Sequence, residues 1–158
     1  MQEYGRILLP VPNKLAVIIL NWRIINMDFK DQPFIPMLFG GDINTYSVAR
    51  AFYEEYQVKT YVFGKFPSGP SYNSNIIEYH ADLKIDTDDV FMKTVRDFAA
   101  AHADKTVLTI GCGDSYVALC SRHKDEMPKN VVAPYIDFEL MDRLQQKELF
   151  YRLCREHD

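Results

Sequence analysis

Two glycine-rich turns, each followed by an aspartate, are the parts of this sequence best suited to chemistry. They read GGD at residues 40–42 and GCGD at residues 111–114, and each follows an apolar run typical of a buried strand. Glycine accepts a positive φ and lets a ligand approach the backbone closely. Nearby carboxylate and amide groups can meet a cationic or hydroxylated substrate group. The candidate cleft residues are therefore Gly40, Gly41, Asp42, Asn44, Gly111, Gly113 and Asp114.

A structural explanation of the same turns is that each aspartate caps a helix. A carboxylate at a helix N-terminus occupies the free N–H groups that would otherwise hold a phosphate. Neither turn matches the dinucleotide-binding pattern G-x-G-x-x-G or the P-loop pattern G-x-x-x-x-G-K-[ST]. A substrate contact and a helix cap therefore both remain open for these aspartates.

The stretch TVLTIGCGDSYVAL, residues 106–119, is similar to the cofactor loop of S-adenosylmethionine-dependent methyltransferases. That loop has the pattern D-x-G-x-G after the first strand of its domain. Here Thr109 stands in place of the acidic residue, Asp114 replaces a small residue, and the turn comes late in the chain. A methyltransferase is therefore the less favoured alternative. Cys112 in this turn is expected to be a buried, inert thiol, with Asp114 raising its pKa.

The elements that must position these turns alternate along the chain. Apolar and β-branched runs predict strands at residues 34–41, 59–64, 105–111 and 130–136, with a weaker one at 76–85. Helical spacing of apolar residues predicts helices at 42–56, 86–103, 114–127 and 137–157. Such alternation predicts right-handed βαβ units. The predicted fold is a Rossmann-like three-layer α/β/α domain with a mainly parallel sheet of about five strands.

Composition and charge narrow the function class. The chain has 158 residues, 47% of them hydrophobic, and a formal net charge of −4, which suits one globular domain and gives no footprint for nucleic acid. Three cysteines without CxxC spacing and four scattered histidines argue against disulfides and a metal site. These features indicate a cytoplasmic protein.

The first 26 residues lie outside the alternation of predicted strands and helices, which begins at Phe34. Their apolar core, LAVIIL at residues 15–20, is too short to span a membrane. We expect Met27 to be the functional start, with residues 1–26 as an N-terminal extension and residues 27–158 as the domain. The alternative is that the extension adds a strand to the domain.

Three stretches together resemble one family. Residues 34–56, 107–127 and 133–158 resemble the N-terminal, pre-ATP-grasp domain of ATP-grasp carboxylate–amine ligases, and the nearest likeness is to the D-aspartate ligase type. The resemblance implies that this Rossmann-like domain comes first and that the nucleotide-binding and metal-binding domains follow. It also implies that Lys147 contacts the nucleotide, the alternative being an exposed lysine on an amphipathic helix.

The resemblance implies that the chain is the substrate-side domain or a fragment of an ATP-dependent ligase, and that it is not catalytic alone. ATP and Mg²⁺ would serve the complete enzyme, and neither is expected to bind this chain tightly. The implied partners are a carboxylate and an amine, with aspartate and a peptidoglycan precursor as the nearest suggestions, and the missing ATP-grasp domains. Apolar surface that those domains would cover could support a homodimer. The alternative function is a free-standing α/β module that binds a small polar ligand.

Overall fold

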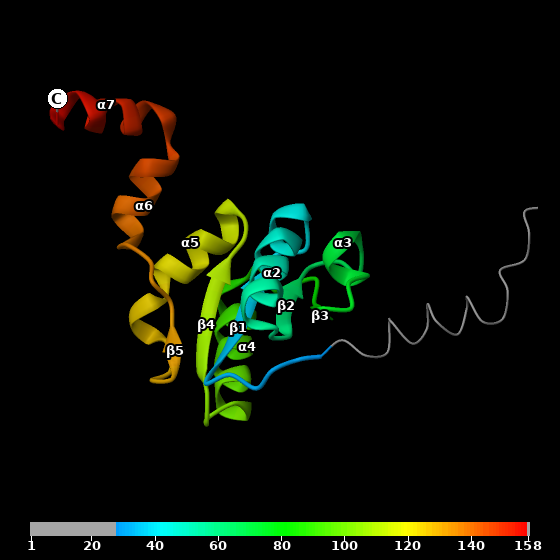
Figure 1. Ribbon diagram of the computed structural model, residues 1–158. Coiled ribbons are helices and arrows are strands. Elements are labelled where there is room, and N and C mark those ends of the chain that lie inside the picture. Colours follow the sequence, from blue (N-terminus) through cyan, green and yellow to red (C-terminus); the bar gives the residue numbers. More distant parts are fainter. Residues whose placement is uncertain (1–27, 158) are drawn as a thin grey trace, which may run out of the picture.

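A computed structural model of the protein describes residues 28–157 (Figure 1). Five strands form one sheet: β1 (Phe34–Phe39), β2 (Thr60–Gly64), β3 (Ile77–Ala81), β4 (Thr106–Gly111) and β5 (Val131–Val132). The helices between and after them are α2 (Ile43–Tyr56), α3 (Gly69–Tyr72), α4 (Asp88–Ala101), α5 (Asp114–Arg122), the 3₁₀ turn η1 (Lys124–Glu126), α6 (Phe138–Gln145) and α7 (Lys147–His157). The predictions for residues 1–26 lie outside the described residues.

The sheet has the strand order β3-β2-β1-β4-β5, and every pair of neighbouring strands is parallel. β1 lies at its centre and is almost entirely buried, which explains its continuous apolar sequence. It pairs with β4 from Phe34 to Phe39, but with β2 only from Met37 onward. Pro36, just before Met37, has no N–H to donate, so the ladder toward β2 begins after it.

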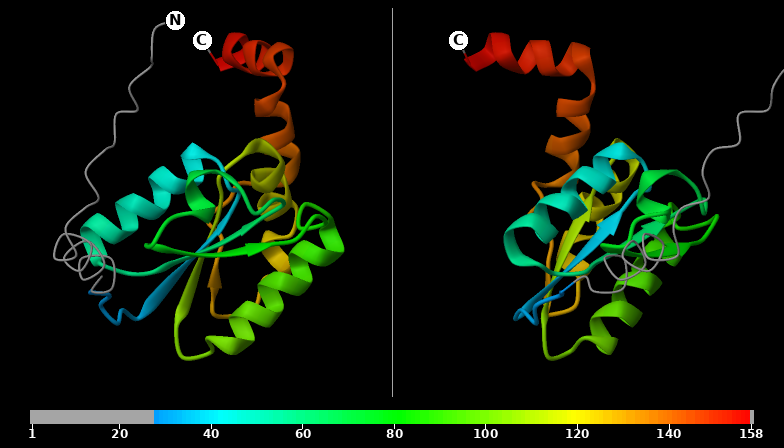
Figure 2. Two further views of the ribbon diagram at one scale, coloured as in Figure 1. Left: turned by 90° about the vertical axis from the view of Figure 1, so that its right-hand side faces the viewer. Right: turned by 45° about the vertical axis from the view of Figure 1, so that its right-hand side comes forward.

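Helices cover both faces of the sheet, as Figure 2 shows. Alternate residues of β1 point to opposite faces: Met37 and Phe39 join a core with Phe91 of α4 and Leu119 of α5. Leu38 points the other way and joins a smaller core with α2. The predicted Rossmann-like α/β/α domain with a five-stranded parallel sheet is confirmed.

The boundaries differ from the sequence prediction in the last third of the chain. The strand predicted at residues 130–136 is shortened to β5, because Pro134 lacks an N–H and the chain leaves the sheet. The helix predicted at 137–157 is two helices, since Gln146 between them has extended backbone with ψ 110°. The helix predicted at 114–127 ends at Arg122 and continues as the 3₁₀ turn η1.

The last two helices form an arm. Helix α6 contacts α5 and α7 follows α6 after Gln146, and Figure 1 shows the arm extending away from the sheet. Leu140, Phe150 and Tyr151 are exposed on it. Within residues 28–157, no helix combines the length and the apolar character needed to cross a membrane.

Glycines allow the strand ends to lie unusually close together. A Cβ on Gly64 would lie 2.3 Å from the backbone oxygen of Gly40 and 2.0 Å from the Tyr79 hydroxyl. A Cβ on Gly111 would lie 2.6 Å from backbone atoms of Tyr116 and Val117. These contacts are too short for any side chain, so the ends of β2 and β4 require glycine.

This packing makes a stability prediction. Gly64→Ala should lower the free energy of unfolding by about 2–3 kcal/mol, because the added methyl group meets backbone that cannot move aside cheaply. The matched control is Gly113→Ala, whose Cβ would have its nearest neighbour at 3.9 Å. It should lose about 1 kcal/mol or less, the cost of alanine at an N-cap. Urea unfolding measures both, and equal losses would contradict the close-packing explanation.

Candidate functional site

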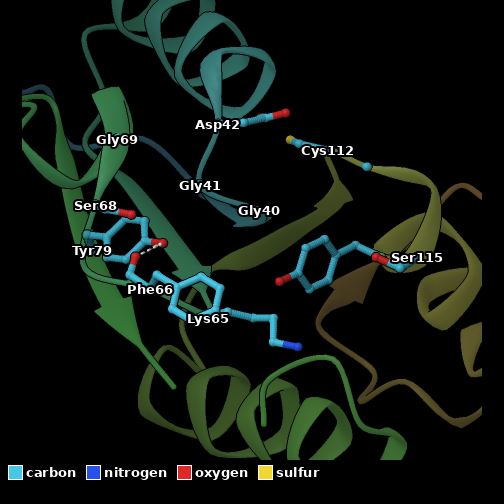
Figure 3. Close-up of a pocket in the computed structure, with 12 residues that line it drawn as sticks. Gly40, Gly41, Asp42, Lys65, Phe66, Ser68, Gly69, Tyr79, Cys112 and Ser115 are labelled. Carbon is cyan, nitrogen blue, oxygen red and sulfur yellow. Dashed lines mark hydrogen bonds between the residues drawn. The ribbon is translucent and has the colours of Figure 1, made fainter. Parts of the chain in front are cut away.

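A pocket of about 390 Å³ opens at the carboxyl ends of β1, β2 and β4 (Figure 3). In a parallel α/β sheet this edge is where ligands bind, since the loops after the strands converge there. The volume suits a small-molecule ligand. The residues that line it are Gly40, Gly41, Asp42, Lys65, Phe66, Ser68, Gly69, Tyr79, Cys112, Gly113, Ser115 and Tyr116.

The structure brings four of the candidate cleft residues to this pocket and leaves three outside its lining. The glycines of the first turn, Asp42 and Gly113 line it. Asn44 is the second residue of α2, and its side-chain amide donates to the Asp42 carboxylate at 3.1 Å. The Gly111 N–H is taken by the Tyr135 hydroxyl at 2.7 Å. Asp114 is an exposed first residue of α5.

Lys147 is separate from the pocket lining. It is the exposed first residue of α7, on the arm that extends from the sheet. Any contact between Lys147 and a ligand would therefore be made at the arm and not in the pocket.

Asp42 acts as the N-cap of α2, and its carboxylate is largely engaged in that role. Its Oδ1 accepts from the backbone N–H groups of Asn44 and Thr45, both at 3.1 Å, and from the Thr45 hydroxyl at 3.0 Å. Burial would raise the pKa of Asp42, but these hydrogen bonds outweigh it and lower that pKa. Asp42 is therefore a stable anion that closes the α2 N-terminus to anionic ligands.

The turn itself leaves no space for a side chain. Gly40 has φ of +146°, and a Cβ there would lie 2.3 Å from the Thr45 hydroxyl. Glycine is thus required at this position both by conformation and by the cap beside it.

The N-terminus of α5 is built differently. Its N-cap is Gly113, which has extended backbone and supplies no side-chain cap. Asp114 follows as the first helical residue, so it does not cap α5 as the structural explanation of the turns required. The first turn of α5 is therefore the end that remains open toward the pocket, beside Ser115.

Tyr116 adds a protonated phenol to the pocket wall. Burial raises the pKa of Tyr116 to about 12, and the negative charge of Asp86 and the nearby Tyr79 add to the shift. Its hydroxyl therefore keeps its proton at neutral pH and can donate a hydrogen bond. Tyr79 donates its own proton to the Phe66 carbonyl at 2.9 Å, as the dashed line in Figure 3 shows.

Lys65 is the cation that sequence reasoning missed. It directly follows β2, and its ammonium lies 2.7 Å from the Asp86 carboxylate. The signal was present: residues immediately after a parallel strand face the ligand edge of the sheet. The aromatic and hydroxyl residues of the pocket were missed as well, because loops distant in sequence bring them together.

Cys112 lines the pocket as a protonated thiol. Burial raises the pKa of Cys112 to about 11, a hydrogen bond with Thr45 opposes the shift, and the charge of Asp42 adds to it. The expected inert thiol is thus explained by burial and Asp42, and not by Asp114. Within residues 28–157, no group of three or more His, Cys, Asp or Glu side chains lies close enough to hold a metal ion.

The Asp42 cap generates a test. Asp42→Ala should lower the free energy of unfolding by about 1–2 kcal/mol, while Asp42→Asn should lose less, since an amide oxygen can still cap. Because the folded pKa is lowered, the stability that the charge contributes is present above the unfolded pKa of about 3.9. It is lost as the pH falls through the lowered folded value. The advantage of wild type over Asp42→Asn in denaturant titrations should therefore shrink below about pH 4; a constant difference would argue against a charged cap.

Sequence comparison adds one relative. The chain is 36% identical over 132 residues to the D-aspartate ligase of Enterococcus faecium (strain Aus0004). The match covers 82% of this chain and 31% of that ligase, so the chain spans about a third of its relative's length. No protein-family model and no solved structure matches the chain. The resemblance to the D-aspartate ligase type is thereby confirmed.

Proposed function

We propose that this chain is the N-terminal, substrate-side domain of an ATP-dependent carboxylate–amine ligase of the ATP-grasp type. The observation that carries the proposal is the 36% identity to a D-aspartate ligase over 82% of the chain. The pocket at the ends of β1, β2 and β4 supports it, because it gives this domain a cleft wall for a small molecule.

The chain is proposed to be non-catalytic alone. Within residues 28–157, neither glycine turn matches a phosphate-binding pattern. ATP and Mg²⁺ would be held by the remainder of the ligase, where they supply and stabilise the transferred phosphoryl group.

The reaction proposed for the complete enzyme has two steps. The substrate carboxylate takes the γ-phosphoryl group of ATP, releasing ADP, and becomes an acyl phosphate. An amine then attacks the acyl carbon, the carbon–oxygen bond to phosphate breaks, and an amide and inorganic phosphate form as the amine gives up a proton. This domain would contribute the pocket that binds and orients the substrate. Aspartate is the proposed carboxylate and a peptidoglycan precursor the proposed source of the amine, in the cytoplasm.

A chimaera tests this function directly. The matched region of the Enterococcus ligase is replaced by this chain, and ADP release is measured with D-aspartate and the ligase's amine acceptor. We expect activity that depends on D-aspartate in the chimaera and no ATP turnover by the chain alone. A chimaera that unfolds cooperatively yet shows no turnover that depends on D-aspartate would refute the proposal. Turnover by the chain alone would refute its non-catalytic status.

Lys147 is proposed to contact the nucleotide in the complete enzyme. As a compact point charge at the exposed start of α7, it suits a phosphate from a neighbouring domain. In the chimaera, Lys147→Ala should raise the KM for ATP by about five- to tenfold, the loss of one exposed charge contact. The KM for D-aspartate should stay unchanged. The matched control is Lys129→Ala, which changes another exposed lysine. An equal KM for ATP in both variants would contradict a nucleotide contact by Lys147.

A further inference from the structure

The candidate pocket contains several hydrogen-bond donors that the chain itself leaves free. The Asp42 carboxylate is largely engaged in capping α2, and the Tyr79 proton is donated to Phe66. The groups still able to donate are the Lys65 ammonium, the Tyr116 phenol, the hydroxyls of Ser68 and Ser115 and the uncapped first turn of α5. Free donors gathered around one cation can hold an anionic ligand group.

Lys65 supplies the positive charge among the lining residues. Its ion pair with Asp86 uses one of its three N–H groups and leaves two for a ligand. The Lys65 side chain is 38% exposed and that of Asp86 32%, so the pair is half-buried at the pocket edge. Figure 3 shows the Lys65 side chain running along the pocket on the side opposite Asp42. Asp86 therefore holds the ammonium in place without using all of its hydrogen-bond donors.

We propose that Lys65 is the specificity-determining residue that binds a carboxylate of an acidic substrate, with Asp86 as its positioning residue. The inference rests on the proposed function and adds to it the residue that reads the substrate's charge. The ligand class is a small dicarboxylic acid or acidic amino acid, one carboxylate of which stays free for Lys65 while the other reacts.

A carboxylate fits these groups better than a phosphate. The pocket lining contains one lysine and no arginine. A phosphate monoester carries a charge of about −1.5 to −2. Asp42 in the pocket lining and Asp86 beside Lys65 would repel it more than they would repel a carboxylate. A carboxylate, with its smaller charge, therefore fits the one ammonium better, and the neutral hydroxyls can complete its hydrogen bonds.

The first experiment titrates the full chain and follows backbone amide NMR signals. We expect D-aspartate to shift the signals of Gly41, Gly113 and Ser115, and its neutral isostere D-asparagine to shift them far less. Lys65→Met should weaken D-aspartate binding about tenfold, the loss of one charged hydrogen bond. Lys65→Arg should retain more of the affinity. Lys84→Met, an exposed lysine outside the pocket lining, is the matched control and should bind as wild type.

The positioning role of Asp86 has its own readout. Asp86→Asn should reduce the preference for D-aspartate over D-asparagine, because the ammonium loses its anchor. If Asp86→Asn weakens the binding of both ligands equally, Asp86 has only a structural role and the positioning role is overturned.

The outcomes separate this inference from the proposed function. Unchanged D-aspartate affinity in Lys65→Met, or no shift of pocket signals by D-aspartate in the wild type, overturns the inference. Inorganic phosphate that competes with D-aspartate and binds more tightly overturns the choice of carboxylate. The function itself is judged by the chimaera: in it, Lys65→Met should raise the KM for D-aspartate about tenfold and change kcat and the KM for ATP far less.

Discussion

The close approach of three backbone segments at one end of the sheet is the constraint on which the site depends. β1, β2 and β4 end side by side, and Gly40, Gly64 and Gly111 stand where any Cβ would collide with a neighbour. Because these glycines bring the loops together, side chains from four parts of the sequence can face one pocket. The site is thus a product of backbone packing first and of side-chain chemistry second.

The two helices whose N-termini face the pocket differ in how those N-termini are capped. α2 carries an internal anion, Asp42, bound by its own N–H groups, while α5 begins at an uncapped glycine. The same sequence motif, glycines followed by aspartate, therefore gives a closed end in one case and an open end in the other. The difference arises from a shift of one residue in the position of the aspartate relative to the helix start.

Features with a local sequence signal could be predicted, and features that depend on local backbone breaks or on tertiary packing could not. Hydrophobic periodicity was sufficient for the strands and for the layered fold, since β1 and α4 have unambiguous apolar patterns. Periodicity does not register breaks such as Gln146, where apolar spacing continues while the backbone turns extended. In the site, the glycine turns were visible and Lys65 directly follows a predicted strand, whereas Tyr116 reaches the pocket through tertiary packing that no local pattern encodes. Gly111 was predicted as a cleft residue, but it lies outside the pocket lining and donates its N–H to the Tyr135 hydroxyl.

Pro36 in the central strand affects which end of the sheet is held by fewer hydrogen bonds. With no donor at Pro36, β1 holds β2 only through the half nearest the pocket, while its bonds to β4 run along its whole length. Fewer hydrogen bonds therefore hold the β2–β3 edge to β1 at the end remote from the ligand site. We therefore expect the backbone amides at that end of β2 to exchange with solvent before those beside the pocket.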